Sequence, residues 1–287
     1  MRLKPLENIK EYLAGRIPKY LIDYIPRRWE RIGDVLVIKI NDKTEPYKHV
    51  IAEAYAKYTN SKAVLNDKSG IKGVYREPVF EHLYGSKDTT TTHIENHIRY
   101  KLDPQRIMFS SGNMHERLRM STISNKDEVV VDLFAGIGYF TLPIAVYSRP
   151  RRIYACELNP LAYNFLLENI TLNNVNDIVQ PLNGDNRVVA PKDVADRVII
   201  GYLHDSLSYV PLAFESLKNH EGVIHYHGLH PDEEIPEEPL KTISKIAEKY
   251  NRSISLDKCV NVKSYAPRIR HIVLDIRIRD DKTWLKK

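Results

Sequence analysis

The alternation of strand-like and helix-like segments after residue 105 constrains the fold of this chain more than any other feature. Short apolar, β-branched runs recur there and are joined by short loops to segments with helical spacing. The expected strands are 128–132, 152–156, 178–182, 197–200 and 222–226. The expected helices are 113–121, 140–147, 160–173, 210–217 and 239–250. This pattern of βαβ units predicts an α/β fold with a mostly parallel, doubly wound sheet.

The two ends of the chain depart from this alternation. Two successive strand-like runs, 255–264 and 270–279, have no helix between them, so we expect them to pair antiparallel at an edge of the sheet. Before residue 105 the patterns are shorter and less regular. They are helical over 9–24 and 47–58 and strand-like over 35–40, 62–75 and 89–102. The sequence predicts a small N-terminal α+β domain over residues 1–104 and the α/β domain over 105–287.

Composition narrows the class of protein. Of the 287 residues, 43% are hydrophobic, which suits a globular core, and no apolar stretch approaches the roughly 20 residues of a membrane span. Charges are scattered through the first 20 residues, so we expect no signal peptide and a cytoplasmic location. Cys156 and Cys259 form no CxxC pair and are expected to be small buried residues. Residues 1–31 hold eight basic against four acidic side chains, either solvated surface or an RNA-binding surface.

The most informative segment is 129–141, Val-Val-Val-Asp-Leu-Phe-Ala-Gly-Ile-Gly-Tyr-Phe-Thr. A buried strand ends there in an acidic residue and is followed by two glycines and an apolar helix. The glycines allow the backbone to turn tightly at the carboxyl end of the strand, where doubly wound folds bind nucleotides. The second strand ends at Glu157, 19 residues after Gly138, where a carboxylate can accept both hydroxyls of a ribose.

The chemistry of this loop favours S-adenosylmethionine over a dinucleotide. Asp132 precedes the first glycine, and the loop lacks the third glycine of G-x-G-x-x-G. A carboxylate there repels a pyrophosphate but suits a sulfonium. The third strand leads to Asp185 and Asn186, whose side chains can hydrogen-bond an adenine edge. A nucleic-acid-binding module with a vestigial pocket is disfavoured, because acceptors follow all three strands.

At these residues the chain resembles the class I S-adenosylmethionine-dependent transferases, with their Rossmann-like fold and a C-terminal antiparallel hairpin. It is more closely similar to the tRNA-modifying branch that includes the tRNA (guanine-N1)-methyltransferase acting at position 37. The resemblance runs from about residue 90 to 275. The motifs that carry it are Thr92-His-Ile-Glu-Asn96, Lys101-Leu-Asp103, Met108-Phe-Ser110, Glu116-Arg117, Asp132-Leu-Phe-Ala-Gly-Ile-Gly138, Glu157-Leu-Asn-Pro160, Gly184-Asp-Asn-Arg187 and Lys263-Ser-Tyr-Ala-Pro267.

Two departures indicate which member of the branch the chain resembles most. The methyltransferase has Asn-x-Pro after the fourth strand, where this chain has Gly201-Tyr-Leu-His204, and its Phe-Ser-Pro-Arg is replaced by Phe109-Ser-Ser-Gly112. The segment is similar to that of the wybutosine-synthesizing aminocarboxypropyltransferases. That resemblance implies transfer of the 3-amino-3-carboxypropyl group of S-adenosylmethionine to 4-demethylwyosine in tRNA(Phe), without an obligate protein partner or membrane. The alternative is the tRNA (guanine-N1)-methyltransferase reaction.

The resemblance also implies the roles of individual residues. The expected contacts to S-adenosylmethionine are Ser110, Arg117, Phe134, Gly136, Glu157, Asp185 and Asn186. Arg117 is expected to hold the carboxylate of the transferred arm, the alternative being an ion pair with Glu116 or Asp127. His204 and Asp205 follow the fourth strand, where the acceptor base should lie, and are candidates for proton removal; a turn-capping role is the alternative for Asp205.

Two further groups of side chains bear on partners. The candidates for contacts to RNA phosphates are Arg149, Arg151, Arg152 and Arg268. A histidine cluster, H-x-H-x-x-H, is formed by His225, His227 and His230 at the end of a predicted strand. It has no acidic or cysteine partner at ligand spacing, so we expect packing or substrate contact there and no metal.

Overall fold

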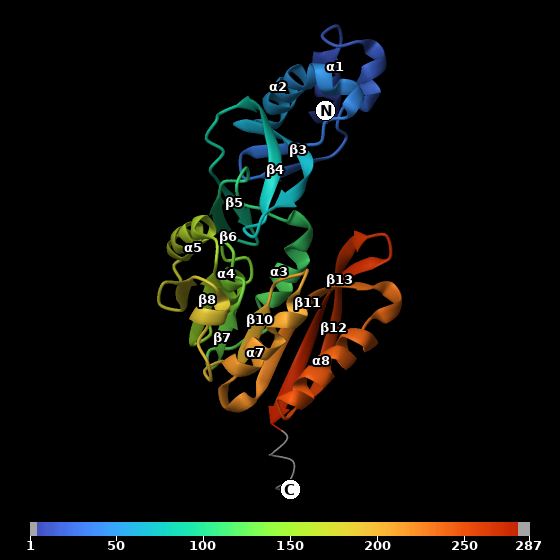
Figure 1. Ribbon diagram of the computed structural model, residues 1–287. Coiled ribbons are helices and arrows are strands. Elements are labelled where there is room, and N and C mark those ends of the chain that lie inside the picture. Colours follow the sequence, from blue (N-terminus) through green and yellow to red (C-terminus); the bar gives the residue numbers. More distant parts are fainter. Residues whose placement is uncertain (1–4, 281–287) are drawn as a thin grey trace. The chain divides into compact units, whose positions relative to one another are not determined.

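The computed structural model describes residues 5–280, and the chain divides into two compact units, Met1–Ser111 and Gly112–Lys287 (Figure 1). The division predicted from the sequence, between residues 104 and 105, stays a prediction of where the domains separate. Two of the N-terminal basic residues, Arg2 and Lys4, lie outside the described residues. None of the helices within residues 5–280 is long and apolar enough to cross a membrane.

The first unit combines two helices with two small sheets. The larger sheet has the strand order β1-β2-β3-β4, in which β2 and β3 are parallel and the other pairs antiparallel, while β5 and β6 form an antiparallel pair. The elements of the first unit are α1 (Pro5–Leu13), η1 (Lys19–Tyr24), β1 (Trp29–Ile32), β2 (Val35–Ile38), η2 (Asp42–Tyr47), α2 (Lys48–Thr59), β3 (Ala63–Lys72), β4 (Glu77–Gly85), β5 (Thr91–Glu95) and β6 (Ile98–Leu102). The short helix η3 (Ser111–Asn113) spans the division between the units.

The helical segment expected over 9–24 is interrupted in the structure. Helix α1 ends at Leu13, and the chain resumes helical turns only in η1. Gly15 has φ +77°, which a continuing right-handed helix does not allow, and Pro18 lacks the amide that helix hydrogen bonding requires. The apolar spacing was read correctly as helical, but the two breakers divide it.

The second unit contains the predicted α/β sheet. Its seven strands have the order β12-β13-β11-β10-β7-β8-β9, with β11, β10, β7, β8 and β9 parallel. Its elements are α3 (Met114–Met120), β7 (Val129–Asp132), α4 (Thr141–Pro143), η4 (Ile144–Ser148), β8 (Arg152–Glu157), α5 (Pro160–Leu172), β9 (Val179–Asn183), α6 (Asn186–Val189), β10 (Arg197–Ile200), η5 (Ser206–Tyr209), α7 (Val210–Ser216), η6 (Lys218–His220), β11 (Gly222–Pro231), η7 (Asp232–Glu234), α8 (Glu237–Lys249), β12 (Arg252–Ala266) and β13 (Ile269–Asp280). The expectation of a mostly parallel sheet is confirmed.

The antiparallel C-terminal hairpin is also confirmed. Strand β13 pairs antiparallel with β11 on one side and with β12 on the other, so β12 forms the edge of the sheet. This edge position explains one wrong expectation. Cys156, on the interior strand β8, is buried as predicted, whereas Cys259 on β12 is exposed, because an edge strand has no neighbour on its outer side.

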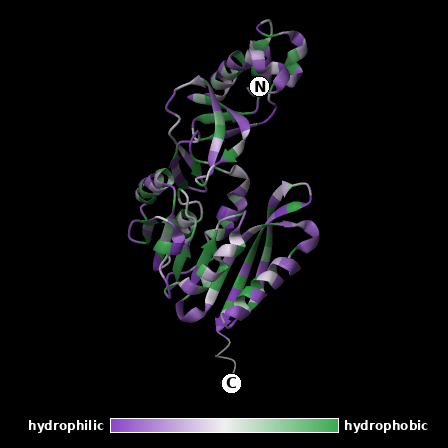
Figure 2. Cartoon of the chain, in the orientation of Figure 1, coloured by the Kyte–Doolittle hydropathy of each residue, from purple (hydrophilic) through white to green (hydrophobic). Residues whose placement is uncertain are grey.

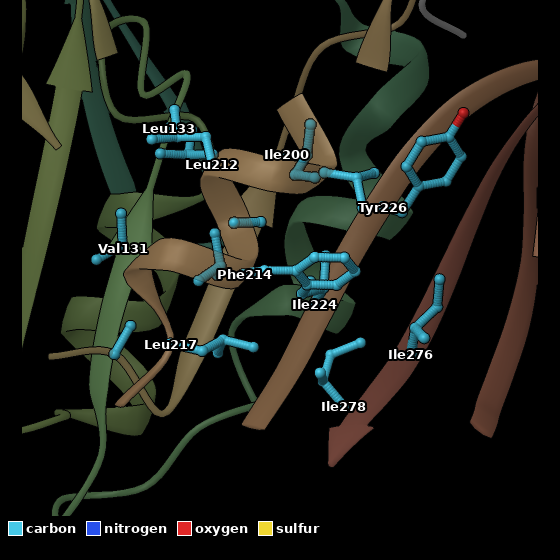
Figure 3. Packing of buried hydrophobic residues seen from close by; sticks show 14 of the residues in the cluster. Val131, Leu133, Ile200, Leu212, Phe214, Leu217, Ile224, Tyr226, Ile276 and Ile278 are labelled. Carbon is cyan, nitrogen blue, oxygen red and sulfur yellow. The ribbon is translucent and has the colours of Figure 1, made fainter. Parts of the chain in front are cut away.

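A hydrophobic core of the second unit forms between its sheet and the helices α7 and α8. Figure 2 shows hydrophobic residues along the central strands of this sheet, alternating hydrophobic and hydrophilic residues along β12 and β13, and α8 as a helix of mixed hydropathy whose buried residues include Ile243 and Ala247. In Figure 3, Phe214 of α7 lies among aliphatic side chains of β10, β11 and β13. The labelled residues of this core are Val131, Leu133, Ile200, Leu212, Phe214, Leu217, Ile224, Tyr226, Ile276 and Ile278. This packing fixes the strand ends on which the site is built.

The helix predicted over 140–147 is irregular. It consists of the short α4 followed by the π-helix η4, whose hydrogen bond joins the Arg149 amide to the Ile144 carbonyl at 3.1 Å. Pro143 lies at the junction and has no amide to donate, so the regular pattern of helix hydrogen bonds is broken there. The location of the helix was predicted correctly, but its type was not.

Candidate active site

The loop after β7 has a backbone that only glycine accommodates. Gly136 has φ +59° and Gly138 has φ +101°. A Cβ atom on Gly136 would lie 2.4 Å from the Tyr139 ring, and one on Gly138 would lie 2.6 Å from Cγ of Leu142. The loop therefore turns tightly at the carboxyl end of β7, as the Ala-Gly-x-Gly pattern predicts.

Asp132 supports this loop from within the protein. Its carboxylate is fully buried and accepts hydrogen bonds from the Thr141 hydroxyl at 2.8 Å and the Phe134 amide at 3.2 Å. Burial raises the pKa of Asp132 to about 6. Both carboxylate oxygens thus join the end of β7 to the start of α4, and the residue acts on the site through the shape of the loop.

Glu157 ends β8 beside the glycine loop. One carboxylate oxygen accepts a hydrogen bond from the Gly136 amide at 2.7 Å and the other accepts one from the Asn159 amide at 2.7 Å. Burial raises the pKa of the carboxyl, against the effect of these two bonds. Each oxygen of a carboxylate can accept two hydrogen bonds, so Glu157 retains acceptor capacity for the hydroxyls of a ribose.

Asp185 and Asn186 follow β9 and begin α6. The Asp185 side chain caps this helix by accepting from the Arg187 amide at 2.9 Å. Asn186 donates from Nδ2 to the Leu133 carbonyl at 2.8 Å, which ties α6 to the loop after β7. Its Oδ1 atom is buried and has no hydrogen-bond partner among the described residues. An acceptor without a partner at this place fits a ligand donor such as the adenine amino group.

Aromatic rings line the ends of β7 and β10. Phe134 stacks on Tyr202 with ring centroids 5.0 Å apart and planes 13° apart, and meets Tyr209 edge-on at 4.7 Å. His204 is exposed and meets Tyr202 and Tyr265 edge-on, at 6.3 Å and 6.2 Å. The three tyrosines were not predicted from the sequence. Tyr202 and Tyr265 lie within motifs noted in the sequence, but only the tertiary structure shows that they share one row of rings with Tyr209.

Gly201 shapes the same region. A Cβ atom at this position would lie 3.2 Å from the Phe140 ring and 3.8 Å from the Phe134 carbonyl oxygen. The missing side chain therefore allows the ring of Phe140 to pack against the end of β10. His204 and Asp205 follow at the same end of the sheet, and both are exposed.

Arg117 lies on α3, whose buried residues are Glu116, Arg117 and Met120. Only 2% of Arg117 is exposed, so its side chain lies inside the protein and not on the helix surface. Ser110 belongs to the first unit and is half-buried there. Of the expected cofactor contacts, the structure gathers Phe134, Gly136, Glu157, Asp185 and Asn186 around the ends of β7, β8 and β9.

The candidate RNA contacts fall at two ends of the sheet. Arg149 and Arg151 precede β8 and are exposed, and Arg152 begins it, so all three lie at the opposite end of that strand from Glu157. Arg149 forms an exposed ion pair with Asp177 at 3.4 Å. Arg268 is exposed in the turn between β12 and β13, next to the residue that pairs with Pro231 at the carboxyl end of β11.

The histidine cluster is part of the buried structure. His225 and His227 are each 1% exposed, and Nδ1 of His227 lies 3.2 Å from Nε2 of His271. Burial lowers the pKa of His227 well below its ordinary value, so both rings of the pair are neutral at pH 7. Within residues 5–280, no group of three or more His, Cys, Asp or Glu side chains could hold a metal ion.

Acid should destabilise the protein through His271. Burial, together with the charge of Lys263, lowers the pKa of His271 to about 4, so the unfolded chain binds its proton more readily than the folded chain. The contribution of His271 to the free energy of unfolding is therefore present above pH ~6.5 and is lost as the pH falls towards ~4. Asp132, with its raised pKa, acts in the opposite direction.

The difference in the free energy of unfolding between the unmutated protein and His271→Asn reports on His271 alone of the two groups, because Asp132 is present in both proteins. The stability advantage of the unmutated protein should shrink by about 2 kcal/mol between pH 7 and pH 5. Denaturant unfolding at the two pH values measures it. An advantage that is the same at both would contradict a lowered pKa.

The fold and the site define a class of protein. A glycine loop follows one strand of a parallel sheet, an acidic residue ends the next, and the third is followed by a buried amide whose oxygen has no partner among the described residues. With an antiparallel hairpin closing the sheet, this is the nucleoside-binding arrangement of a class I S-adenosylmethionine-dependent transferase.

Comparisons with known proteins narrow this class. Residues 91–255 match the TRM5/TYW2 methyltransferase domain, and residues 9–89 match the TYW2 N-terminal domain. The chain is 43% identical to a tRNA(Phe) (4-demethylwyosine(37)-C(7)) aminocarboxypropyltransferase of Pyrococcus horikoshii, over 96% of this chain and 97% of that protein. It is also 43% identical to the enzyme of the same name from Methanocaldococcus jannaschii, over 87% of this chain and 97% of that one.

Solved structures agree with these matches. The crystal structure of P. horikoshii TYW2 in complex with MeSAdo matches with a TM-score of 0.87 and 41% identity, covering 95% of this chain and 98% of that one. Trm5b of Pyrococcus abyssi matches with a TM-score of 0.79 and 33% identity, over 91% of this chain and 78% of that one. The chain belongs to the TRM5/TYW2 family of S-adenosylmethionine-dependent transferases.

Proposed function

We propose that this chain transfers the 3-amino-3-carboxypropyl group of S-adenosylmethionine to C7 of 4-demethylwyosine at position 37 of tRNA(Phe). The observation that carries the proposal is the 43% identity, over nearly the full length of both chains, to the P. horikoshii enzyme of that name. The nucleoside site supports it, because Glu157, Asn186 and the glycine loop suit an adenosine with free ribose hydroxyls.

The reaction is an in-line displacement at the γ-carbon of the arm, with the sulfonium sulfur as the leaving group. C7 of the base forms a bond to the γ-carbon of the arm, the bond from that carbon to sulfur breaks, and its electron pair stays on sulfur as methylthioadenosine leaves. The proton of C7 is then lost. The carbon that faces the nucleophile in line with the breaking bond is the one transferred, so the protein selects the reaction by orientation. Arg117 is proposed to hold the arm's carboxylate, with Ser110 as a further contact, and His204 or Asp205 to receive the proton.

Product analysis tests the proposal. Unmutated protein, S-adenosylmethionine and tRNA(Phe) carrying 4-demethylwyosine should give tRNA heavier by one aminocarboxypropyl group, together with methylthioadenosine. The relative Trm5b of P. abyssi is 35% identical and is named as a tRNA (guanine(37)-N(1))-methyltransferase, which makes methyl transfer the competing activity. A gain of one methyl group with release of S-adenosylhomocysteine would overturn the assignment.

The tRNA is proposed to contact both units. The basic side chains of the first unit and Arg268, at the carboxyl end of the sheet, supply positive charge for phosphates. Arg149, Arg151 and Arg152, at the other end of β8, are proposed to contact the backbone away from the reacting base. A cytoplasmic location is part of this proposal and is supported by the tRNA substrate, and the proposed reaction requires no second protein.

Replacing Arg149, Arg151 and Arg152 together with glutamine should weaken tRNA binding and flatten its dependence on salt. Each lost phosphate contact reduces the slope of log K against log salt by about 1. Titrations at several salt concentrations measure the slope, with Arg268→Gln as the comparison at the other end of the sheet. The affinity for S-adenosylmethionine should not change. If only Arg268→Gln altered the slope, the RNA would be assigned to the carboxyl end of the sheet and not to the end that carries Arg149, Arg151 and Arg152.

A further inference from the structure

Helix α3 requires tertiary contacts to fix its position. It has only seven residues, Met114–Met120, and its N-cap Asn113 makes no side-chain capping bond. A helix of this length is not stable alone in water. It nevertheless carries Arg117, so the contacts that hold α3 also decide where that guanidinium lies.

Those contacts centre on Arg119. Its Nε and Nη2 atoms donate to the two carboxylate oxygens of Glu116, at 2.8 Å and 2.7 Å. Nη1 and Nη2 donate to the carboxylate of Asp275 on β13, at 2.6 Å and 3.2 Å. The side chains of Arg119, Glu116 and Asp275 are 17%, 1% and 11% exposed. A planar guanidinium held by two carboxylates has its position and its plane fixed.

Asp275 is itself held from the other side, by His225 on β11. Nδ1 of His225 donates to Asp275 at 2.6 Å, and Nε2 accepts from Arg197 at 3.0 Å. Arg197 in turn forms two hydrogen bonds with Glu128, at 3.0 Å and 2.9 Å. Burial lowers the pKa of His225, which favours this neutral ring, while the hydrogen bonds from His225 and Arg119 hold the pKa of Asp275 low. The carboxylate is thus ionised and fixed between α3 and the sheet.

We propose that Asp275 and Arg119 are positioning residues, which hold α3 on the sheet so that Arg117 meets the carboxylate of the transferred arm. The inference rests on the proposed function, because it takes Arg117 as the contact of that carboxylate. Buried ion pairs add little net stability compared with apolar residues of the same size, but they fix geometry. A displacement of about 1 Å in a reacting geometry can cost about 100-fold in rate.

Asp275→Asn tests the proposal, because it removes the charge and keeps the size of the side chain. Calorimetry should show S-adenosylmethionine bound at least ~10-fold more weakly, with methylthioadenosine, which lacks the arm, bound within about 2-fold of normal. Asp257→Asn is the matched control. It breaks the 2.6 Å pair between Asp257 and Arg277, which lies exposed on the same hairpin, and it should change neither affinity.

Equal weakening of both ligands, or no weakening of either, would overturn the positioning role. If Asp275→Asn does not fold, Arg119→Lys is tested instead, and the same results are expected. Lysine keeps the positive charge but loses the planar guanidinium that donates to two carboxylates at once. The unmutated protein distinguishes this inference from the proposed function. If it transfers a methyl group, the function fails; if it transfers the arm while the variant binds both ligands normally, only the positioning role fails.

Discussion

Replacing Arg117 with alanine should reduce aminocarboxypropyl transfer by on the order of 100-fold or more, while methylthioadenosine binds almost as well as before. Removing one partner of a buried, charge-assisted pair costs about 2–5 kcal/mol, and methylthioadenosine has no carboxylate that could lose a partner. Arg117 is 2% exposed, so little solvent is present to replace it. Single-turnover transfer, followed by the mass of the tRNA base, and calorimetry with both ligands measure the two effects.

The comparison between ligands separates a specific effect from general damage. A variant that binds methylthioadenosine and S-adenosylmethionine with equally reduced affinity would refute Arg117 as the contact of the arm. Arg117→Lys provides the graded control. It keeps one positive charge but loses the two-pronged geometry, so its transfer rate should lie between those of the alanine variant and the unmutated protein.

Replacing Glu157 with alanine should produce the opposite pattern. Both ligands contain the same ribose, so both should bind more weakly by about 1–3 kcal/mol, because two hydroxyls lose their acceptor. The substitution also removes the acceptor of the Gly136 and Asn159 amides, which loosens the glycine loop that both ligands share. Calorimetry measures both affinities in protein whose fold is verified by circular dichroism.

Glu157→Gln refines this prediction. The amide keeps one acceptor oxygen and replaces the other with a donor, so it should bind both ligands more tightly than the alanine variant and less tightly than the unmutated protein. Unchanged affinity in folded Glu157→Ala would remove the ribose assignment. Loss confined to S-adenosylmethionine would instead place Glu157 beside the transferred arm.

The nucleoside half of the site was predictable because its residues lie at the ends of strands. Two strand ends can be recognised from an apolar run that is followed by an acidic residue, Asp132 in one strand and Glu157 in the other. Parallel strands bring their carboxyl ends to one edge, so sequence order alone places these groups together. What the pattern did not predict is that the Asp132 carboxylate is fully buried and that both of its oxygens accept hydrogen bonds inside the loop.

The parts of the site that could not be predicted depend on contacts between residues that are distant in sequence. Arg119 and Asp275 are 156 positions apart, and neither stands in a motif that suggests the other. The stacking of Phe134 on Tyr202 similarly joins the ends of two different strands. Cys259 shows a related limit, because the position of its strand at an edge of the sheet was predicted, but the exposure of this one side chain was not.

The nucleoside contacts have a consequence for turnover. Glu157 and the unpartnered oxygen of Asn186 are fixed to rigid strand ends, and they hold parts of the molecule that the reaction leaves unchanged. Substrate and spent nucleoside therefore compete for the same place with much of the same binding energy. Product inhibition follows, and the rate of tRNA modification would depend on how quickly the cell clears methylthioadenosine as well as on the supply of S-adenosylmethionine.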